Sequence, residues 1–153
     1  MAKKDNKIEQ IKELAENLLA KLSVNADVVI KQEDSHYRID ITSEDAQLLI
    51  GFKGQTLSAL EHMMRVLSTK EEPADFTLSV DVGGYRAKRM DELGRKTKEI
   101  AWTVKQTGIK EVLPPMNAAE RRHIHQLLND IEGVIGESEG FGRDRRLVLK
   151  PKK

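Results

Sequence analysis

A four-residue loop with glycine at both ends, Gly51-Phe52-Lys53-Gly54, lies between two segments of helical pattern and strongly limits how the chain can fold. Apolar residues repeat at three- and four-residue steps on both sides of it. Glycine adopts backbone conformations that end one helix and start another, and it lets the backbone approach a phosphate closely. Lys53 is the only lysine or arginine between Arg38 and Arg65, so the loop has a cation at its tip.

The pattern of residues 1–82 predicts the order helix, strand, strand, helix, helix, strand. Two β-rich runs separated by Asp34-Ser35 form a hairpin, and Tyr37, Ile39 and Ile41 share one face of the second run. Thr42 or Ser43 is expected to cap a helix that begins at Glu44. The expected elements are a helix over residues 5–22, strands over 26–33 and 36–41, helices over 44–50 and from 55 to before 71–73, and a strand over 76–81.

Residues 83–153 predict a second, small α/β module. A helix is expected from Tyr85 to Gln106, with Leu93 and Val104 facing inward and its arginines and lysines mostly solvated. Asn117 with Glu120 three residues later has the spacing of a capping box that begins another helix. Short strands are expected over residues 134–136 and 146–149, joined by a glycine-rich turn over 138–143.

Composition narrows the class of protein. With 39% hydrophobic and 33% charged residues, the chain has the balance of a globular protein, and without cysteine it has neither disulfides nor thiolate metal sites. No segment approaches the roughly 18 apolar residues of a membrane span, so we expect a cytoplasmic protein without membrane insertion. Residues 1–82 hold 10 Lys/Arg and 15 Asp/Glu, whereas residues 83–153 hold 16 and 10. The basic second half is typical of a polyanion binder.

The glycine loop has two interpretations. It is either a tight turn between helices or a cradle for phosphate groups. Together with the predicted element order and with Leu48-Leu49-Ile50 before it and Gln55-Thr56-Leu57-Ser58-Ala59-Leu60 after it, the loop resembles that of a type II KH domain. The resemblance implies that residues 51–54 clamp the backbone of a single strand and that Ile50 and Leu57 line a groove for its bases.

Arg121 and His125 form a second candidate site. They are four residues apart on a predicted helix and therefore share a face, where an arginine fork and an imidazole suit a phosphate or a base. Arg122 is adjacent, and Arg143, Arg145 and Arg146 would join this face if the last strand returned along it. The alternative is that His125 is partly buried and that Arg121 pairs with Glu120 or Asp144.

The stretches over residues 114–125 and 138–151 resemble the Arg-x-x-x-His domain of the Jag (SpoIIIJ-associated, KhpB) family, whose members place a KH domain before it. The resemblance implies a bacterial RNA-binding regulator linked to cell elongation, division or sporulation, with a small KH protein, KhpA, as a partner. Longer members carry an N-terminal Jag domain, which this sequence does not match. The expected division is an N-terminal helix over 1–23, a KH domain over 24–82 and the Arg-x-x-x-His domain over 83–153.

These observations predict an α+β protein that binds single-stranded RNA or single-stranded DNA and performs no catalysis. An enzyme is disfavoured because His123 and His125 point to different sides of a helix and no metal-binding motif is present, so no cofactor or metal is expected. The remaining alternative is an adaptor whose acidic KH unit mediates a homodimer or a heterodimer. The predicted nucleic-acid-binding residues are Ile50, Gly51, Phe52, Lys53, Gly54, Leu57, Arg121, Arg122, His125, Arg143, Arg145 and Arg146.

Overall fold

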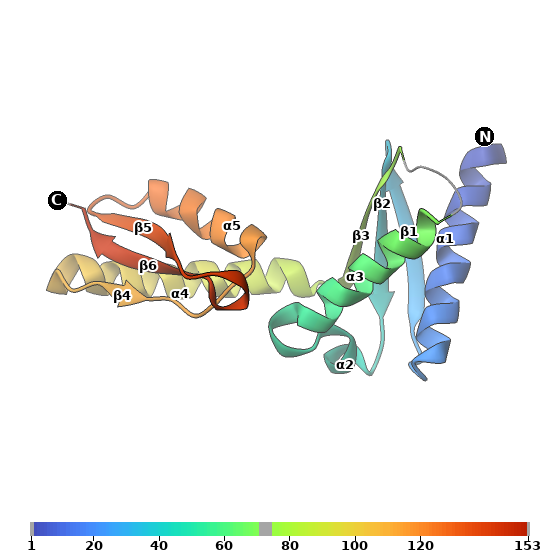
Figure 1. Ribbon diagram of the computed structural model, residues 1–153, viewed down its shortest axis with the longest axis horizontal. Coiled ribbons are helices and arrows are strands. Elements are labelled where there is room, and N and C mark those ends of the chain that lie inside the picture. Colours follow the sequence, from blue (N-terminus) through green and yellow to red (C-terminus); the bar gives the residue numbers. More distant parts are fainter. Residues whose placement is uncertain (1, 71–74, 153) are drawn as a thin grey trace. The chain divides into compact units, whose positions relative to one another are not determined.

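Alternating apolar residues build a three-stranded sheet in the first of two structural units, which comprise residues 1–86 and 87–153. The computed structural model describes residues 2–70 and 75–152 (Figure 1). In the first unit, β1 and β2 form an antiparallel hairpin and β3 pairs in parallel with β2. The elements are α1 (Ala2–Lys21), β1 (Asp27–Glu33), β2 (His36–Thr42), α2 (Ala46–Ile50), the 3-10 turn η1 (Phe52–Gly54), α3 (Gln55–Ser68) and β3 (Thr77–Val82).

One face of this sheet carries the core of the first unit. The register places Ile39 of β2 between Ile30 of β1 and Val80 of β3, and Tyr37, Ile39 and Ile41 are all buried, as alternation predicted. Helices α1 and α3 cover this face (Figure 1) and close a single apolar cluster with it. The predicted order of helix, strand, strand, helix, helix, strand is therefore confirmed.

The start of α2 differs from the prediction. The helix begins at Ala46, two residues after the expected Glu44, and Asp45 is its N-cap without a side-chain cap bond. The hydroxyl of Ser43 instead accepts a hydrogen bond from the backbone N–H of Asp45 and donates one to the carbonyl of Asn25. This local turn competes with helix formation and delays it. Residues 71–73, expected just after α3, lie outside the described residues.

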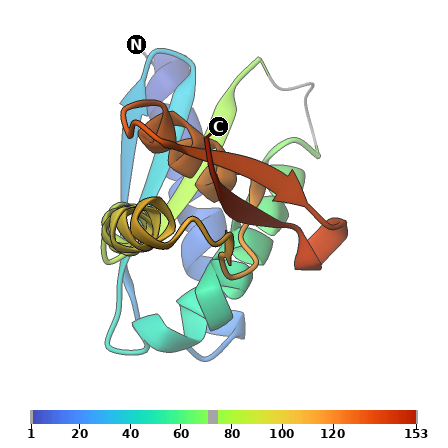
Figure 2. The ribbon, with the colours of Figure 1, turned by 90° about the vertical axis from the view of Figure 1, so that its left-hand side faces the viewer.

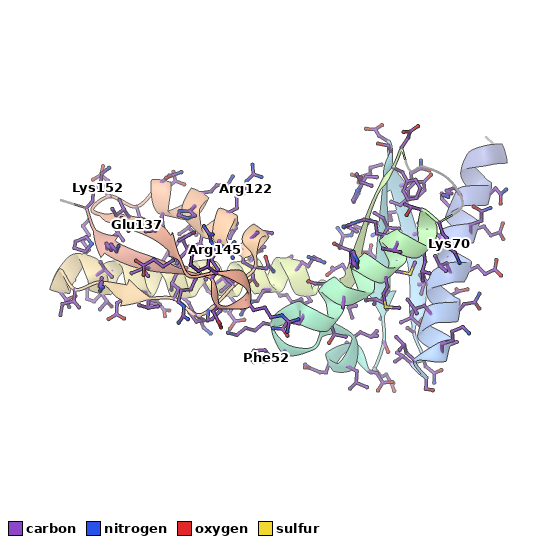
Figure 3. The ribbon with its side chains drawn as sticks, viewed as in Figure 1. Phe52, Lys70, Arg122, Glu137, Arg145 and Lys152 are labelled. Carbon is purple, nitrogen blue, oxygen red and sulfur yellow. The ribbon has the colours of Figure 1, made fainter. Side chains whose placement is uncertain are left out.

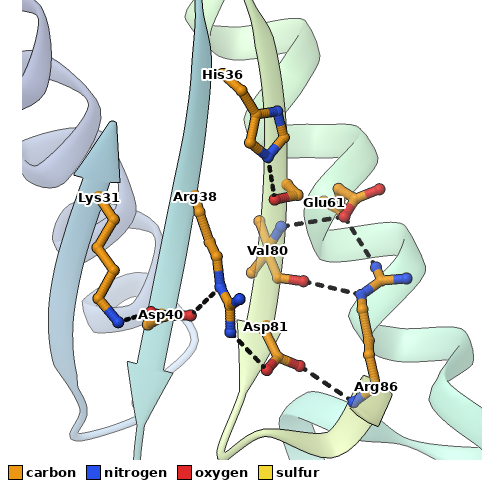
Figure 4. A network of polar contacts seen from close by, with 9 residues as sticks. Lys31, His36, Arg38, Asp40, Glu61, Val80, Asp81 and Arg86 are labelled. Atoms are coloured by element: carbon orange, nitrogen blue, oxygen red, sulfur yellow. Dashed lines mark hydrogen bonds and ion pairs between the residues drawn. The ribbon is translucent and has the colours of Figure 1, made fainter. Parts of the chain in front are cut away.

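The opposite face of the first sheet is polar (Figure 4). Asp40 accepts from Lys31 at 2.9 Å and from Arg38 at 2.7 Å, and Arg38 also pairs with Asp81. Burial opposes ionisation of Asp40, but the hydrogen bonds from Lys31 and Arg38 outweigh it and hold the pKa of this carboxyl below its ordinary value. The sheet therefore has helices on one face and paired charges on the other.

The lowered pKa of Asp40 predicts a dependence of stability on pH. The stabilisation is complete above the unfolded pKa of about 3.9 and is lost as the pH falls through the lower folded value. Asp40→Asn should reduce the acid-induced loss of unfolding free energy by about 0.2–1 kcal/mol, the range of partly exposed ion pairs. Urea unfolding followed by circular dichroism from neutral to acidic pH measures this, with Glu44→Gln as the exposed control. Identical pH profiles for Asp40→Asn and wild type would contradict it.

The second unit contains an antiparallel sheet with the strand order β4-β6-β5. Helix α4 begins at Tyr85 and supplies residues from Ala87 onward to this unit; Figure 2 views it nearly along its axis. Leu93 and Val104 of α4, Ile124 of α5 and Leu147 of β6 belong to one buried cluster. The elements are α4 (Tyr85–Thr107), β4 (Glu111–Val112), α5 (Ala118–Asn129), β5 (Val134–Glu139), the 3-10 turn η2 (Gly142–Asp144) and β6 (Arg146–Pro151).

Two features of this sheet were not predicted. The two-residue strand β4 pairs with β6 through Glu111↔Leu149 and Val112↔Val148, although so short a segment has no periodicity of its own. Strand β5 continues through Glu139, whereas the sequence predicted a turn from residue 138. Pairing with β6 extends the strand into polar residues, which is a tertiary effect. Within the described residues, no helix is both long and apolar enough to span a membrane.

Candidate nucleic-acid interface

The glycines of the loop at residues 51–54 are required by close packing. Gly51 has φ +68°, and a Cβ atom there would lie 2.0 Å from Oγ1 of Thr56. Gly54 has φ +77°, and its Cβ would lie 2.8 Å from the ring of Tyr85. No side chain fits at either position, so both ends of the loop require glycine. The spacing of the two glycines thus has a structural reason independent of any ligand.

The two middle residues of the loop differ in exposure, because Phe52 is exposed whereas Lys53 is half-buried. The Phe52 ring is 72% exposed, and Figure 3 labels it at the loop. Lys53 adopts a left-handed conformation with φ +51°, and its ammonium lies 5.2 Å from the centre of the Phe52 ring. An exposed aromatic face with a cation beside it suits stacking on a base and contact with a phosphate.

The two residues expected to line a base-binding groove lie mainly in the core. Leu57 is only 1% exposed, because its position on α3 faces the sheet, and it offers almost no surface to a base. Ile50 is half-buried and also packs against this core. Helical periodicity alone does not separate a groove residue from a core residue, since both lie on the apolar side of the helix.

In the second unit, a buried ion pair fixes the start of α5. The side chain of Asn117 accepts from the backbone N–H of Glu120, and the Glu120 carboxylate accepts from that of Asn117, so the predicted capping box is confirmed. The same carboxylate pairs with Arg89 of α4 at 3.0 Å, and the two side chains are only 4% and 13% exposed. Arg89 was expected to be solvated, because its partner lies 31 residues away and no local signal points to it.

Arg121 and His125 follow directly from this cap and share one side of α5, as their spacing predicted. Arg121 donates to the backbone carbonyl of Met116 at 2.6 Å. The Glu120 carboxylate is bound by Arg89, so the alternative of a pair between Arg121 and Glu120 is wrong. His125 is half-buried, and its Nε2 atom shares a hydrogen bond of 3.2 Å with the hydroxyl of Ser138 on β5.

The other arginines differ in their placement. The carbonyl of Arg145 accepts from the N–H of Met116, so Arg145 and Arg121 contact the same residue. Arg146 donates back to the carbonyl of Asp144. Arg143 lies exposed in η2, and Arg122 is exposed on α5. Figure 3 labels Arg122 and Arg145. The backbone of Arg145 thus lies beside Met116, which Arg121 also contacts, but in the described part of the chain no side-chain hydrogen bond joins Arg122, Arg143, Arg145 or Arg146 to Arg121 or Met116.

Unneutralised positive charge characterises this site. Among the residues that the structure describes, Arg121, Arg122, Arg143 and Arg145 have no ion pair with a carboxylate, and the Nε atom of Arg145 is buried without a hydrogen-bond partner. A buried guanidinium donor without a hydrogen bond lowers the stability of the fold unless an acceptor binds to it. Residues 2–70 and 75–152 contain no group of three or more His, Asp or Glu side chains suited to a metal ion. The arrangement therefore suits an anion such as phosphate.

Comparison with known proteins agrees with both units. The family model described as the KH domain of KhpA and KhpB matches residues 8–82, and the family model of the Arg-x-x-x-His domain matches residues 92–151. The whole chain is 31% identical to the RNA-binding protein KhpB of Bacillus subtilis strain 168 and covers 74% of it. The chain belongs to the KhpB family. Its two matched domains follow each other in the order that the sequence predicted.

Further KhpB relatives are longer than this chain. The RNA-binding protein KhpB of Clostridium symbiosum is 29% identical over 86% of the chain, which spans 60% of that protein. That of Lactiplantibacillus plantarum is 30% identical over 94% of the chain, which spans 45% of it. The predicted family and the predicted pair of domains are confirmed.

The Arg89–Glu120 pair predicts a large effect of a residue just outside the range matched by the Arg-x-x-x-His model. Arg89→Leu leaves the Glu120 carboxylate buried without its cation and should lower the unfolding free energy of the second unit by about 3–5 kcal/mol. Arg95→Leu, an exposed change on the same helix, should cost less than about 0.5 kcal/mol. Adding Glu120→Gln to Arg89→Leu should restore part of the loss. Urea unfolding measures all three, and similar effects of Arg89→Leu and Arg95→Leu would refute the prediction.

Proposed function

We propose that this KhpB-family protein binds single-stranded RNA and performs no chemistry on it. The face of α5 that carries Arg121 and His125 holds phosphate groups, assisted by Arg145, while the loop at residues 51–54 contacts the strand through Phe52 and Lys53. RNA is favoured over single-stranded DNA because the curated relatives are named RNA-binding proteins. His123 and His125 are two residues apart and face different sides of α5, which does not favour a shared acid–base role.

The observation that carries this proposal is the absence of a carboxylate partner for Arg121 within the described part of the chain. Glu120 is its sequence neighbour but is bound to Arg89 and to the Asn117 N–H. The Arg121 guanidinium keeps donors beyond its one bond to Met116, and the Nε atom of Arg145 lacks an acceptor. A phosphate oxygen would satisfy the free donors of Arg121, and arginine is well suited to phosphate because its fork binds two oxygens.

The domain boundaries that we propose are those that the sequence predicted. A helix over residues 1–23 packs on a KH domain over 24–82, and an Arg-x-x-x-His domain over 83–153 makes the stronger electrostatic contribution because residues 83–153 hold the excess of Lys and Arg. Arg122, Arg143 and Arg146 contribute to this positive field around the strand. We place the protein in the cytoplasm, because its RNA partner is found there and because a chain without cysteine does not depend on disulfides or on an oxidising compartment.

Binding of a short single-stranded RNA, followed by fluorescence anisotropy, tests the proposal. Arg121→Ala should weaken binding about tenfold at low salt, since one charge-assisted contact with a phosphate is lost. The slope of log affinity against log salt should become shallower by about 0.7 for the same reason. Arg95→Ala removes an exposed arginine of the same unit and is the control. If Lys53→Asp combined with Arg121→Ala bound as tightly as wild type, the proposed sites would be wrong.

A second candidate function concerns a protein partner of the KH unit. Leu48, Met63 and Val66 of α2 and α3 are apolar and 68%, 46% and 51% exposed. Exposed apolar side chains on a small unit suit burial against another protein, here a second copy or a small KH protein such as KhpA. Val66→Glu should then reduce self-association or heterodimer formation without weakening RNA contacts at Arg121. Sedimentation velocity of the variant alone and with KhpA measures this; unchanged association would argue against the surface.

A further inference from the structure

A cavity of about 260 Å³ lies beside His125, between the C-terminal end of α5 and strand β5. Its apolar lining includes Leu128, Ile131 and Val134. Polar lining comes from Asn129, Glu132 and Lys152, and Figure 3 labels Lys152 just after β6. Ligand sites in proteins usually combine such an apolar lining with a few polar groups that fix orientation. The cavity volume falls slightly below the usual range for drug-sized ligands, which begins at about 300 Å³.

Gly136 determines how closely α5 approaches β5 at this cavity. A Cβ atom at residue 136 would lie 2.6 Å from Cδ1 of Leu128 and 3.7 Å from Nδ1 of His125. Without a side chain there, the imidazole stands directly against the backbone of β5. The other ring nitrogen, Nε2, is engaged by Ser138, which fixes the orientation of the ring. His125 thus lines the cavity with an imidazole ring that Ser138 holds in place.

The polar side chains that line the cavity are available to a ligand. Across residues 2–70 and 75–152, no hydrogen bond or ion pair involves the side chains of Asn129, Glu132 or Lys152. By contrast, the neighbouring Lys150 of β6 forms ion pairs with Glu137 and Glu139 of β5. An amide, a carboxylate and an ammonium group, all on exposed residues, therefore remain available around one small cavity of mixed polar and apolar lining, a composition that suits a flat polar heterocycle.

We propose that this cavity receives one nucleobase of the strand, a step that rests on the proposed function of Arg121 and His125. The base stacks on the His125 ring, and its edge meets Asn129, Glu132 and Lys152. Arg121, His125 and Asn129 follow at four-residue steps, so the residues at the two ends of this row are separated by about 12 Å along α5. A phosphate at Arg121 and a base at Asn129 thus belong to one short stretch of strand.

Glu132 gives the cavity a preference among bases. An ionised carboxylate only accepts hydrogen bonds, so it favours a base edge that carries an amino group. Adenine, cytosine and guanine each have an exocyclic amino group, whereas uracil offers a carboxylate only its N3–H, which lies between two carbonyl oxygens. The two carbonyl oxygens that flank this N3–H repel the Glu132 carboxylate, so uracil meets it less favourably than a base with an amino group. The cavity therefore selects amino-bearing bases over uracil.

The test compares oligo(C), oligo(A) and oligo(U) of equal length by fluorescence anisotropy at one salt concentration. Wild-type protein should bind oligo(C) and oligo(A) about fivefold more tightly than oligo(U), the discrimination of a single hydrogen bond. Glu132→Gln offers an amide donor as well as an acceptor and should bring this ratio close to one. Glu111→Gln makes the same charge change on β4, at the opposite edge of the sheet from β5, and should keep the wild-type ratio.

A second readout locates the base directly. Cytidine monophosphate should shift the methyl NMR signals of Leu128 and Val134 in the full chain, and uridine monophosphate should shift them less. If wild type and Glu132→Gln bind all three strands with the same ratio while Arg121→Ala still weakens each of them, the base cavity is wrong and the proposed function stands. If no strand binds wild type at all, both fail together.

Discussion

The buried carboxylate of Glu120 is the interaction on which the second unit depends. It closes the capping box with Asn117 and pairs with Arg89, so one side chain both starts α5 and joins it to α4. A buried charge without partners would be strongly destabilising, which ties the position of α5 to that of Arg89. Because the neighbouring Glu120 is paired with Arg89, the Arg121 guanidinium has no carboxylate partner among the described residues. The Arg89–Glu120 pair thereby stabilises the unit and also leaves the positive charge of Arg121 without a neighbouring carboxylate partner in the described part of the chain.

The first unit uses a similar device at the edge of its sheet. Glu61 of α3 accepts from the backbone N–H of Val80 on β3 and pairs with Arg86, which in turn donates to the Val80 carbonyl (Figure 4). Side chains thus satisfy both backbone groups of an edge strand that would otherwise invite pairing with another chain. Arg86 and Arg89 both belong to α4, and each joins that helix to a carboxylate of its own unit.

The two predicted sites differ in what their sequence motifs mean physically. In the loop at residues 51–54, the glycines are required by packing against Thr56 and Tyr85, and only Phe52 is exposed, while Lys53 is half-buried. In the Arg-x-x-x-His segment, the helix places both named residues on one side, and tertiary contacts orient each of them. The motif residues therefore owe their placement to local loop and helix geometry and to tertiary contacts together.

The sequence by itself determined the order of elements, the hairpin at Asp34-Ser35, the capping box at Asn117 and the common face of Arg121 and His125. All of these are set by neighbours within a few residues, through periodicity, turns and caps. Only the tertiary structure decided that Arg89 is buried against Glu120, that Ser138 belongs to a strand and holds His125, and that Leu57 is core. These outcomes join residues distant in sequence, so the free energy that selects them resides in packing that no local pattern contains.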